Sequence, residues 1–256
     1  MTGDLLKCVL VGELIWLNRE AHCNKSFLGM SESAAGSGLG PSEVRVVALT
    51  GGIASGKSSA SQWLGSQDSD ELRVKVIDAD CIGHQAYADQ EKQCYKRLVE
   101  HFGSGICNVD GSINRRELGG IVFKDPNEMK ALQAIVWPEI ADRLKREIES
   151  IKLEVTHKTL VVVEAAILLE AGWHEQIDFA LILSTQVDPE VAKNRLMQRN
   201  NLDESDAQKR ISSQLSNAER AARVSIVIPN DGTQEEFNAT LAVIFSSSIA
   251  PLFSSH

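Results

Sequence analysis

Hydrophobic positions along the chain follow two alternating patterns. Short apolar runs rich in β-branched residues predict buried strands, whereas longer stretches with apolar residues three or four positions apart predict helices. The predicted strands span residues 46–49, 74–77, 159–163, 179–183 and 225–228. The predicted helices span residues 58–66, 81–96, 97–102, 114–123, 126–151, 189–199, 204–224 and 233–249. Strands that alternate with helices are typical of an α/β fold, in which a parallel sheet carries helices on both faces.

The longest predicted helix starts at Pro126 and shows the clearest helical spacing. Its apolar positions are Met129, Leu132, Ile135, Val136, Ile140, Leu144, Ile148 and Ile151. Pro138 lies inside this helix, where it cannot donate a backbone hydrogen bond and its ring crowds the preceding turn. We therefore expect the helix to break or kink near Val136-Trp137.

Length, charge and cysteine content limit the classes of function. A chain of 256 residues suits one α/β domain with an inserted subdomain, or two small domains. A net charge of −9 argues against a general nucleic-acid-binding surface. The five cysteines are scattered without a Cys-x-x-Cys pair, which indicates free thiols and predicts a cytoplasmic protein. No run of 18 apolar residues is present, so we expect no transmembrane segment. The sequence leaves the oligomeric state open.

The first 43 residues differ from the rest of the chain. Residues 31–42 are rich in Gly and Ser and indicate a flexible linker. Residues 1–43 are therefore expected to form a leader, with organelle targeting as an alternative that their acidic residues weaken. The folded domain is expected at residues 44–250.

A phosphate-binding loop follows the first predicted strand. Gly51-x4-Gly56-Lys57-Ser58 fits the complete pattern, between a strand and a helix. Its backbone N–H groups are expected to surround the phosphates of ATP, with Lys57 on the β- and γ-phosphates and Ser58 on Mg²⁺. The residues expected to bind ATP in this stretch are Gly51, Gly52, Ile53, Ala54, Ser55, Gly56, Lys57, Ser58 and Ser59.

Acidic residues follow two further strands. Asp78 and Asp80 come at the end of the second strand, and if that strand continues they share one of its faces. A carboxylate there could orient an acceptor hydroxyl and take its proton, or the pair could simply form a turn or cap a helix. Glu164 ends the apolar run Val161–Val163, which resembles the pattern of an acid that holds Mg²⁺. The alternative is an ordinary acid at the end of a strand.

Two pairs of arginines could meet phosphate groups. Arg195 and Arg199 are four residues apart on a predicted helix and so share a face. They lie in the region where small kinases place a lid over the nucleotide. The alternative is that this helix is simply charged and solvated. Arg115 and Arg116 form a second basic spot that could neutralise an anionic acceptor, although adjacent arginines are often only surface residues.

Six segments of this chain resemble the dephospho-CoA kinase family in order and spacing. They are TGGIASGKSS, VIDADCIGHQAY, DGSINRREL, VWPEIA, VVVEAAILLEAGW and RLMQRN, and the resemblance spans residues 44–241. The segment EAAILLEAGW is similar to the kinase domain of the eukaryotic bifunctional CoA synthase. The leader does not resemble an adenylyltransferase, so we expect one activity.

The resemblance implies a P-loop kinase fold and a reaction. ATP would phosphorylate the ribose 3′-hydroxyl of dephospho-CoA to give CoA and ADP, the last step of coenzyme A biosynthesis, with Mg²⁺ as cofactor. Asp80 matches the family's catalytic base, and Lys57 and Arg195 match its phosphate-stabilising residues. Arg199 matches a further arginine of the lid, which spans about residues 195–222.

The resemblance also places Arg115 and Arg116 in a helical acceptor-binding subdomain at about residues 82–150.

Two other functions share part of this pattern. Another small-molecule kinase of the nucleoside-monophosphate-kinase-like group would have the loop and the lid arginines, but not both the acid pair and the Asn-Arg-Arg segment. A nucleotide switch would need no acceptor base, so Asp80 argues against it.

Overall fold

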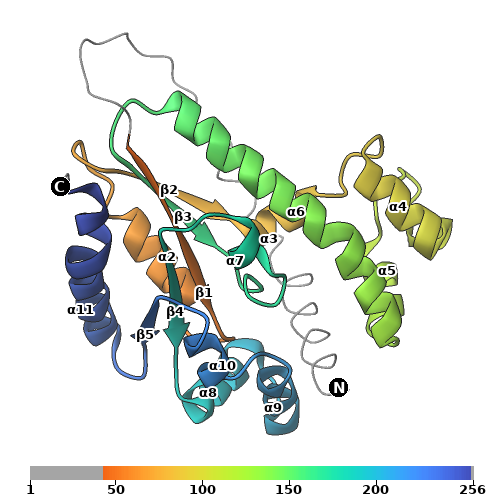
Figure 1. Ribbon diagram of the computed structural model, residues 1–256. Helices are drawn as coiled ribbons and strands as arrows, with labels where there is room; N and C mark the ends of the chain where they lie inside the picture. Colours follow the sequence, from red (N-terminus) through yellow and green to blue (C-terminus); the bar gives the residue numbers. More distant parts are fainter. Residues whose placement is uncertain (1–42, 255–256) are drawn as a thin grey trace.

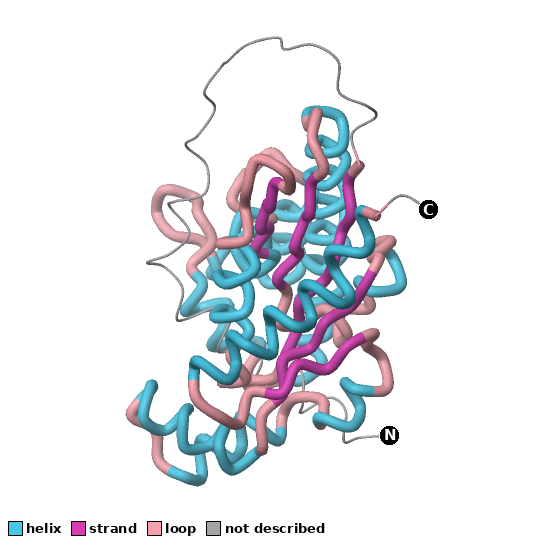
Figure 2. Tube along the Cα trace, turned by 90° about the vertical axis from the view of Figure 1, so that its left-hand side faces the viewer, coloured by secondary structure: helices cyan, strands magenta, loops and turns pink. Residues whose placement is uncertain are grey.

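The computed structural model describes residues 43–254 and shows an α/β fold built on one sheet. The predicted leader and linker lie outside the described residues. Five parallel strands lie in the order β2-β3-β1-β4-β5 (Figures 1 and 2). The strands are β1 (Val44–Gly51), β2 (Arg73–Asp78), β3 (Thr159–Glu164), β4 (Leu181–Gln186) and β5 (Ile226–Pro229). All five predicted strands are therefore present, and the sheet is parallel as expected.

Residues of β1 and β3 alternate between the two faces of the sheet. Val47 and Leu49 of β1 pack with α2 (Lys57–Gly65) and α11 (Gln234–Ile244) on one face. Val46 and Ala48 face the larger core on the other side, which includes α6 (Pro126–Glu154). Figure 1 shows α6 and α11 on opposite sides of the strands. Helices on both faces leave the carboxyl edge of the sheet for ligands.

A helical arm extends from the α6 side of the sheet. It consists of α3 (Ala79–Gln85), α4 (Gln93–Phe102), a short turn Ser104–Ile106, α5 (Arg115–Val122) and α6. In Figure 1, α6 runs from the sheet out to α4 and α5. Leu98, Leu118 and Leu144 are fully buried among these helices, so apolar packing holds the arm together.

Pro138 does not break α6, which is helical from Pro126 to Glu154. Pro138 and Ala134, whose carbonyl loses its helical partner, are both exposed, so water can solvate that carbonyl. Ile135 and Ile140 pack on the buried face on either side of the proline. This packing keeps the two halves in line where the sequence predicted a break or kink.

Two predicted helices are each interrupted by a turn. The prediction of helix over residues 81–96 was wrong for residues 86–92, which separate α3 from α4. The predicted helix 204–224 forms α9 (Glu204–Ser212) and α10 (Asn217–Ala221). Ser216 starts α10 with a capping box, in which its hydroxyl accepts from the backbone of Glu219 and the Glu219 side chain accepts in return.

The C-terminal helical stretch Gln234–Phe253 has a mean hydropathy of 1.3 and could cross a membrane by length and composition alone. The sequence pattern hid this stretch because serines interrupt its apolar residues. Phe237, Leu241 and Phe253 are buried in the core that includes β1 and β3, whereas 22% of the most apolar 18-residue window is buried. In this structure the stretch is a helix of the α/β fold.

Candidate active site

The phosphate-binding loop connects β1 to α2 and begins with a tight turn. Ser55 donates its backbone N–H to the Gly52 carbonyl over 3.2 Å, with Ile53 and Ala54 at the two central positions. Ala54 has a φ of 57° and Gly56 has a φ of 91°. A side chain at Gly56 would also overlap Asn230 Nδ2, so only glycine fits there.

Two buried side chains from other strands support this loop. Asn230, just after β5, donates its Nδ2 to the Ser55 carbonyl over 2.9 Å. The hydroxyls of Ser55 and Thr185, on β4, are 2.7 Å apart. These contacts hold the loop through protein groups alone, which favours an arrangement of its N–H groups that suits an anion.

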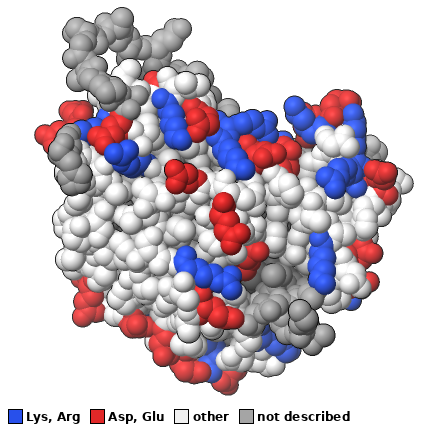
Figure 3. Space-filling view, viewed as in Figure 1, with Lys and Arg blue, Asp and Glu red and all other residues white. Residues whose placement is uncertain are grey.

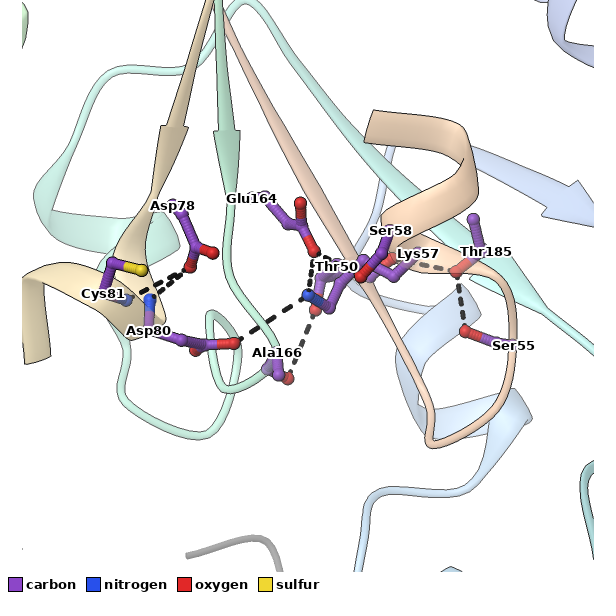
Figure 4. Close-up of polar contacts among 10 residues, drawn as sticks. All are labelled: Thr50, Ser55, Lys57, Ser58, Asp78, Asp80, Cys81, Glu164, Ala166 and Thr185. Atoms are coloured by element: carbon purple, nitrogen blue, oxygen red, sulfur yellow. Dashed lines mark hydrogen bonds and ion pairs between the residues drawn. The ribbon is translucent and has the colours of Figure 1, made fainter. Parts of the chain in front are cut away.

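Lys57, Ser58, Asp80 and Glu164 converge beside the loop (Figure 4). Lys57 Nζ lies 2.6 Å from Glu164 Oε1 and 3.9 Å from Asp80 Oδ2. The side chains of these three residues are 6–11% exposed, so their charges interact with little screening by water. Ser58 Oγ donates to Glu164 Oε1 over 3.0 Å. The structure therefore brings together four of the residues predicted from the sequence.

Asp78 and Asp80 play different parts, because the strand ends at Asp78 and α3 begins with the next residue. The expectation that both acids share one strand face was wrong. Asp78 Oδ1 caps α3 by accepting from the backbone N–H groups of Asp80 and Cys81. Asp80 lies in the first turn of α3, and its carboxylate faces Lys57.

A cavity of about 710 Å³ opens over the phosphate loop. Asp80 lines it, together with Arg195 and Arg199 of α8 (Pro189–Asn200) and all nine loop residues from Gly51 to Ser59. The two arginines therefore share a face as predicted. Gln214 and Asn230 also line the cavity. Both lie in segments that approach the carboxyl edge of the sheet, where Figure 1 places α8, α9 and α10 together.

Arg115 and Arg116 begin α5 and do not line this cavity. Arg115 is half-buried and lies beside Tyr87, whereas Arg116 is exposed. Burial raises the pKa of the Tyr87 phenol, and the charge and hydrogen bond of Arg115 partly oppose that rise. The sequence did not distinguish these two arginines, but the structure gives only Arg115 an internal neighbour of this kind.

Sequence reasoning missed Thr185, Gln214 and Asn230. Asn230 and Thr185 lie at or beyond the carboxyl ends of predicted parallel strands, a position that favours ligand contact and could have singled them out. Gln214 has no such signal in the sequence. It lies in the turn between α9 and α10, which was predicted as part of one continuous helix.

This fold and this cavity define a P-loop kinase. The family model for dephospho-CoA kinase matches residues 45–236 of the 256-residue chain. The chain therefore belongs to the dephospho-CoA kinase family. The predicted resemblance, which spanned residues 44–241, is confirmed.

Curated relatives and solved structures agree with this family. The chain is 36% identical over 203 residues to a dephospho-CoA kinase of Geobacter sulfurreducens, which covers 79% of this chain and 98% of the relative. It is 38% identical over 198 residues to a dephospho-CoA kinase of Geobacillus kaustophilus, covering 77% and 94%. The structure of TT1252 from Thermus thermophilus matches with a TM-score of 0.62 and 29% identity, covering 80% of this chain and 98% of that one. A dephospho-CoA kinase from Campylobacter jejuni shares the fold, with a TM-score of 0.59 and 22% identity over 79% and 96% of the two chains.

Proposed function

We propose that this protein transfers the γ-phosphoryl group of ATP to the ribose 3′-hydroxyl of dephospho-CoA, giving CoA and ADP. Membership of the dephospho-CoA kinase family supports the reaction. The observation that carries the mechanism is the buried Asp80 carboxylate, which faces Lys57 at the edge of the loop cavity. An acid in that position is what transfer to an alcohol requires and what simple nucleotide binding does not.

Asp80 is the proposed base. The acceptor oxygen forms a bond to the γ-phosphorus while the bond to the bridging oxygen of ADP breaks. The hydroxyl proton passes to the Asp80 carboxylate. Because the transition state is loose, the carboxylate mainly orients the hydroxyl and receives its proton late. Asp78 cannot share this role, since its carboxylate oxygen caps α3.

Lys57, Arg195 and Arg199 are the proposed cationic groups. Lys57 lies beside the loop between two carboxylates, which hold its charged end where the phosphate oxygens would bind. Arg195 and Arg199 approach the cavity from α8, on the side of the lid. Charge that develops on the transferred group and on the leaving oxygen would then be stabilised from two directions.

Ser58 and Glu164 are the proposed groups for Mg²⁺. Their oxygen atoms are 3.0 Å apart beside the loop, and oxygen ligands suit this cation. Within residues 43–254 no group of three or more His, Cys, Asp or Glu side chains forms a metal cage. This fits Mg²⁺, which keeps several waters and binds through substrate phosphates and one or two protein groups. When bound, Mg²⁺ would neutralise charge on the β- and γ-phosphates.

The helical arm is the proposed acceptor-binding region, with Arg115 and Arg116 meeting anionic groups of dephospho-CoA. Support comes from continuity: α3 carries Asp80 at its start and leads to Tyr87, which lies beside Arg115. An acceptor held along this arm would reach the base from the side opposite to the lid. The lid, proposed at about residues 195–222, spans α8, α9 and α10.

An assay of ADP release with a panel of acceptors tests the proposed function. We expect release with dephospho-CoA, with CoA identified by its mass, and little release with nucleoside monophosphates or sugar acids. The opposite order would favour another small-molecule kinase. Slow hydrolysis without any acceptor preference would favour a nucleotide switch.

A titration of Mg²⁺ tests the metal site. Glu164→Gln should raise the Mg²⁺ concentration needed for half-maximal rate, because the carboxylate charge is lost while the side-chain shape remains. An unchanged requirement would exclude Glu164 from the metal site. The cytoplasmic location, the absence of nucleic-acid partners and the absence of a transmembrane segment remain predictions. On the face that Figure 3 shows, basic and acidic side chains are interspersed.

A further inference from the structure

The turn that opens the phosphate loop is bound by a residue of the lid. Ile53 donates its backbone N–H to Gln214 Oε1 over 2.7 Å, across 161 residues of sequence. Gln214 Oε1 also lies 3.5 Å from the position that a Cβ would take on Gly52. The amide N–H of Ile53 is therefore used in a hydrogen bond to Gln214 and not in one to a phosphate.

Gln214 belongs to a segment that is itself anchored to the sheet. Asn217, which begins α10, donates its Nδ2 to the Val187 carbonyl over 2.8 Å and accepts from Gln186 Nε2 over 3.0 Å. Both partners belong to the end of β4 and the residue after it. The turn that carries Gln214 is thus attached to the strand next to β1.

A buried ion pair anchors the same segment a second time. Arg220 of α10 is fully buried and lies 3.1 Å from Glu170 Oε1, which follows β3. Arg220 Nε lies 4.0 Å from the Cβ position of Gly52 and has no hydrogen-bond partner among the described residues. The guanidinium group therefore packs beside Gly52, next to Gln214, and does not itself line the cavity.

We propose that Gln214 is a positioning residue for ATP binding, which acts through the Ile53 N–H to hold the first turn of the phosphate loop in its binding conformation. Arg220 and Glu170 support it by fixing α10. This inference rests on the proposed kinase function for its assay. Because Gln214 contacts the loop backbone and not the transferred phosphoryl group, its contact contributes equally to the ground state and the transition state. It should therefore act on the affinity for ATP and not on turnover.

The turn geometry offers a way to remove the donor alone. Ile53 is the second residue of a turn closed from Ser55 to Gly52, and Ala54, at the third position, has a φ of 57°. This is close to a type II turn, which accepts proline at the second position. Ile53→Pro therefore removes the N–H with the turn retained, and Gln214→Met removes the acceptor at similar volume.

The experiment is a double-mutant cycle with Ile53→Pro, Gln214→Met and both together. The control is Gln208→Met, since Gln208 is an exposed glutamine of α9 whose Nε2 donates to Ser212 Oγ and not to the loop. Each single change should raise KM for ATP roughly tenfold, the scale on which losing one partner of a hydrogen bond acts. We expect kcat to change less than about threefold. The KM for ATP of the double variant should not exceed the higher KM of the two single variants, because both changes remove the same contact.

The proposal would be overturned if the two increases in KM for ATP multiplied in the double variant. It would also be overturned if Gln214→Met had the same KM for ATP as Gln208→Met. A fall in kcat at constant KM would overturn it too, since that is what a merely less stable protein with fewer active molecules would show. ATP affinity of the same proteins, measured by calorimetry without acceptor, keeps the two proposals distinct. If the unmodified protein forms no CoA, the kinase proposal fails, while the cycle in ATP affinity still decides the role of Gln214.

Discussion

The phosphate loop and the helical arm are held in place by different kinds of contact. Polar side chains from distant segments fix the loop: Thr185 and Asn230 contact Ser55 across 130 and 175 residues of sequence. In the arm, buried apolar residues such as Leu98 and Leu118 belong to the larger core, and α4 and α5 both contact α6, which follows them in the chain. Directional hydrogen bonds define a geometry closely, whereas apolar packing tolerates small adjustments.

This difference matches the two tasks of the molecule. The loop meets phosphate groups that must be placed within a few tenths of an ångström of their donors. The arm is proposed to bind a larger acceptor, for which apolar packing that tolerates small adjustments is suitable. Asp80 connects the two regions, because it belongs to the first helix of the arm while its carboxylate lies 3.9 Å from Lys57 Nζ.

Replacing Asp80 should have the largest effect, since it breaks the connection between the two regions. Asp80→Asn keeps the shape but cannot accept the proton, so turnover should fall by about 10²–10⁴-fold, with ATP affinity changed by less than about tenfold. Asp78→Asn is the matched control and should cost less, because an amide oxygen can still cap α3. Turnover and ATP binding are measured for both variants. A larger fall in turnover with Asp78→Asn than with Asp80→Asn would show that Asp80 is not the base. Equal loss of binding and turnover with Asp80→Asn would place Asp80 in the metal and nucleotide site.

Lys57→Ala tests the loop side of the comparison alone. The side chain is 11% exposed between Glu164 and Asp80, so its loss removes a cation and leaves two buried carboxylates close together. Turnover should fall at least about 100-fold, the scale of one preorganised electrostatic group. Single-turnover kinetics measure this directly. A variant with nearly normal turnover would show that Lys57 does not act on the transferred phosphate.

Arg115→Met tests the arm side alone. It should raise KM for dephospho-CoA by roughly tenfold through loss of a charge-assisted contact, with the affinity for ATP unchanged because Arg115 lies outside the loop cavity. Arg116→Met is the matched comparison on the same helix turn, and its exposed position predicts a smaller rise. An altered ATP affinity in either variant would show that the arm and the loop are not independent. Unchanged acceptor KM in both would remove these arginines from the acceptor site.

The smallest effect concerns backbone strain in the two regions. Ala54 in the loop has a φ of 57°, so Ala54→Gly should stabilise the protein by about 0.5 kcal/mol after the added entropy of the unfolded chain is subtracted. Gly103 at the end of α4 has a φ of 79° and a ψ of 167°, a conformation largely restricted to glycine, with open space around it. Gly103→Ala should therefore destabilise by about 1 kcal/mol, the backbone strain less the entropy that alanine removes from the unfolded chain. Urea unfolding of both proteins measures these changes. A destabilised Ala54→Gly protein would mean that the Ala54 methyl group makes a packing contact stronger than the strain.

Local sequence determined the strands, the phosphate loop and most helices of this protein. The loop can be predicted because each of its requirements concerns residues that are adjacent in the chain, such as glycine at the positive φ of Gly56. The sequence also contains a signal for the start of α10, the capping box between Ser216 and Glu219. The prediction of one helix over residues 204–224 did not take this signal into account. Pro138 shows the reverse case, in which a strong local signal yields to packing on both sides of it.

The tertiary structure alone decided which polar groups meet. Nothing in the local pattern pairs Ile53 with Gln214, or Ser55 with Thr185 and Asn230, because those contacts depend on how β1, β4 and β5 line up in the sheet. The different parts of Asp78 and Asp80 likewise depend on the point where β2 becomes α3. A strand would have pointed both carboxylates the same way, whereas here Asp78 is the N-cap of α3 and Asp80 lies in its first turn, so the two side chains point apart. Sequence thus fixes the chemistry available at each strand end, and the alignment of the strands fixes which of those groups can act on one another.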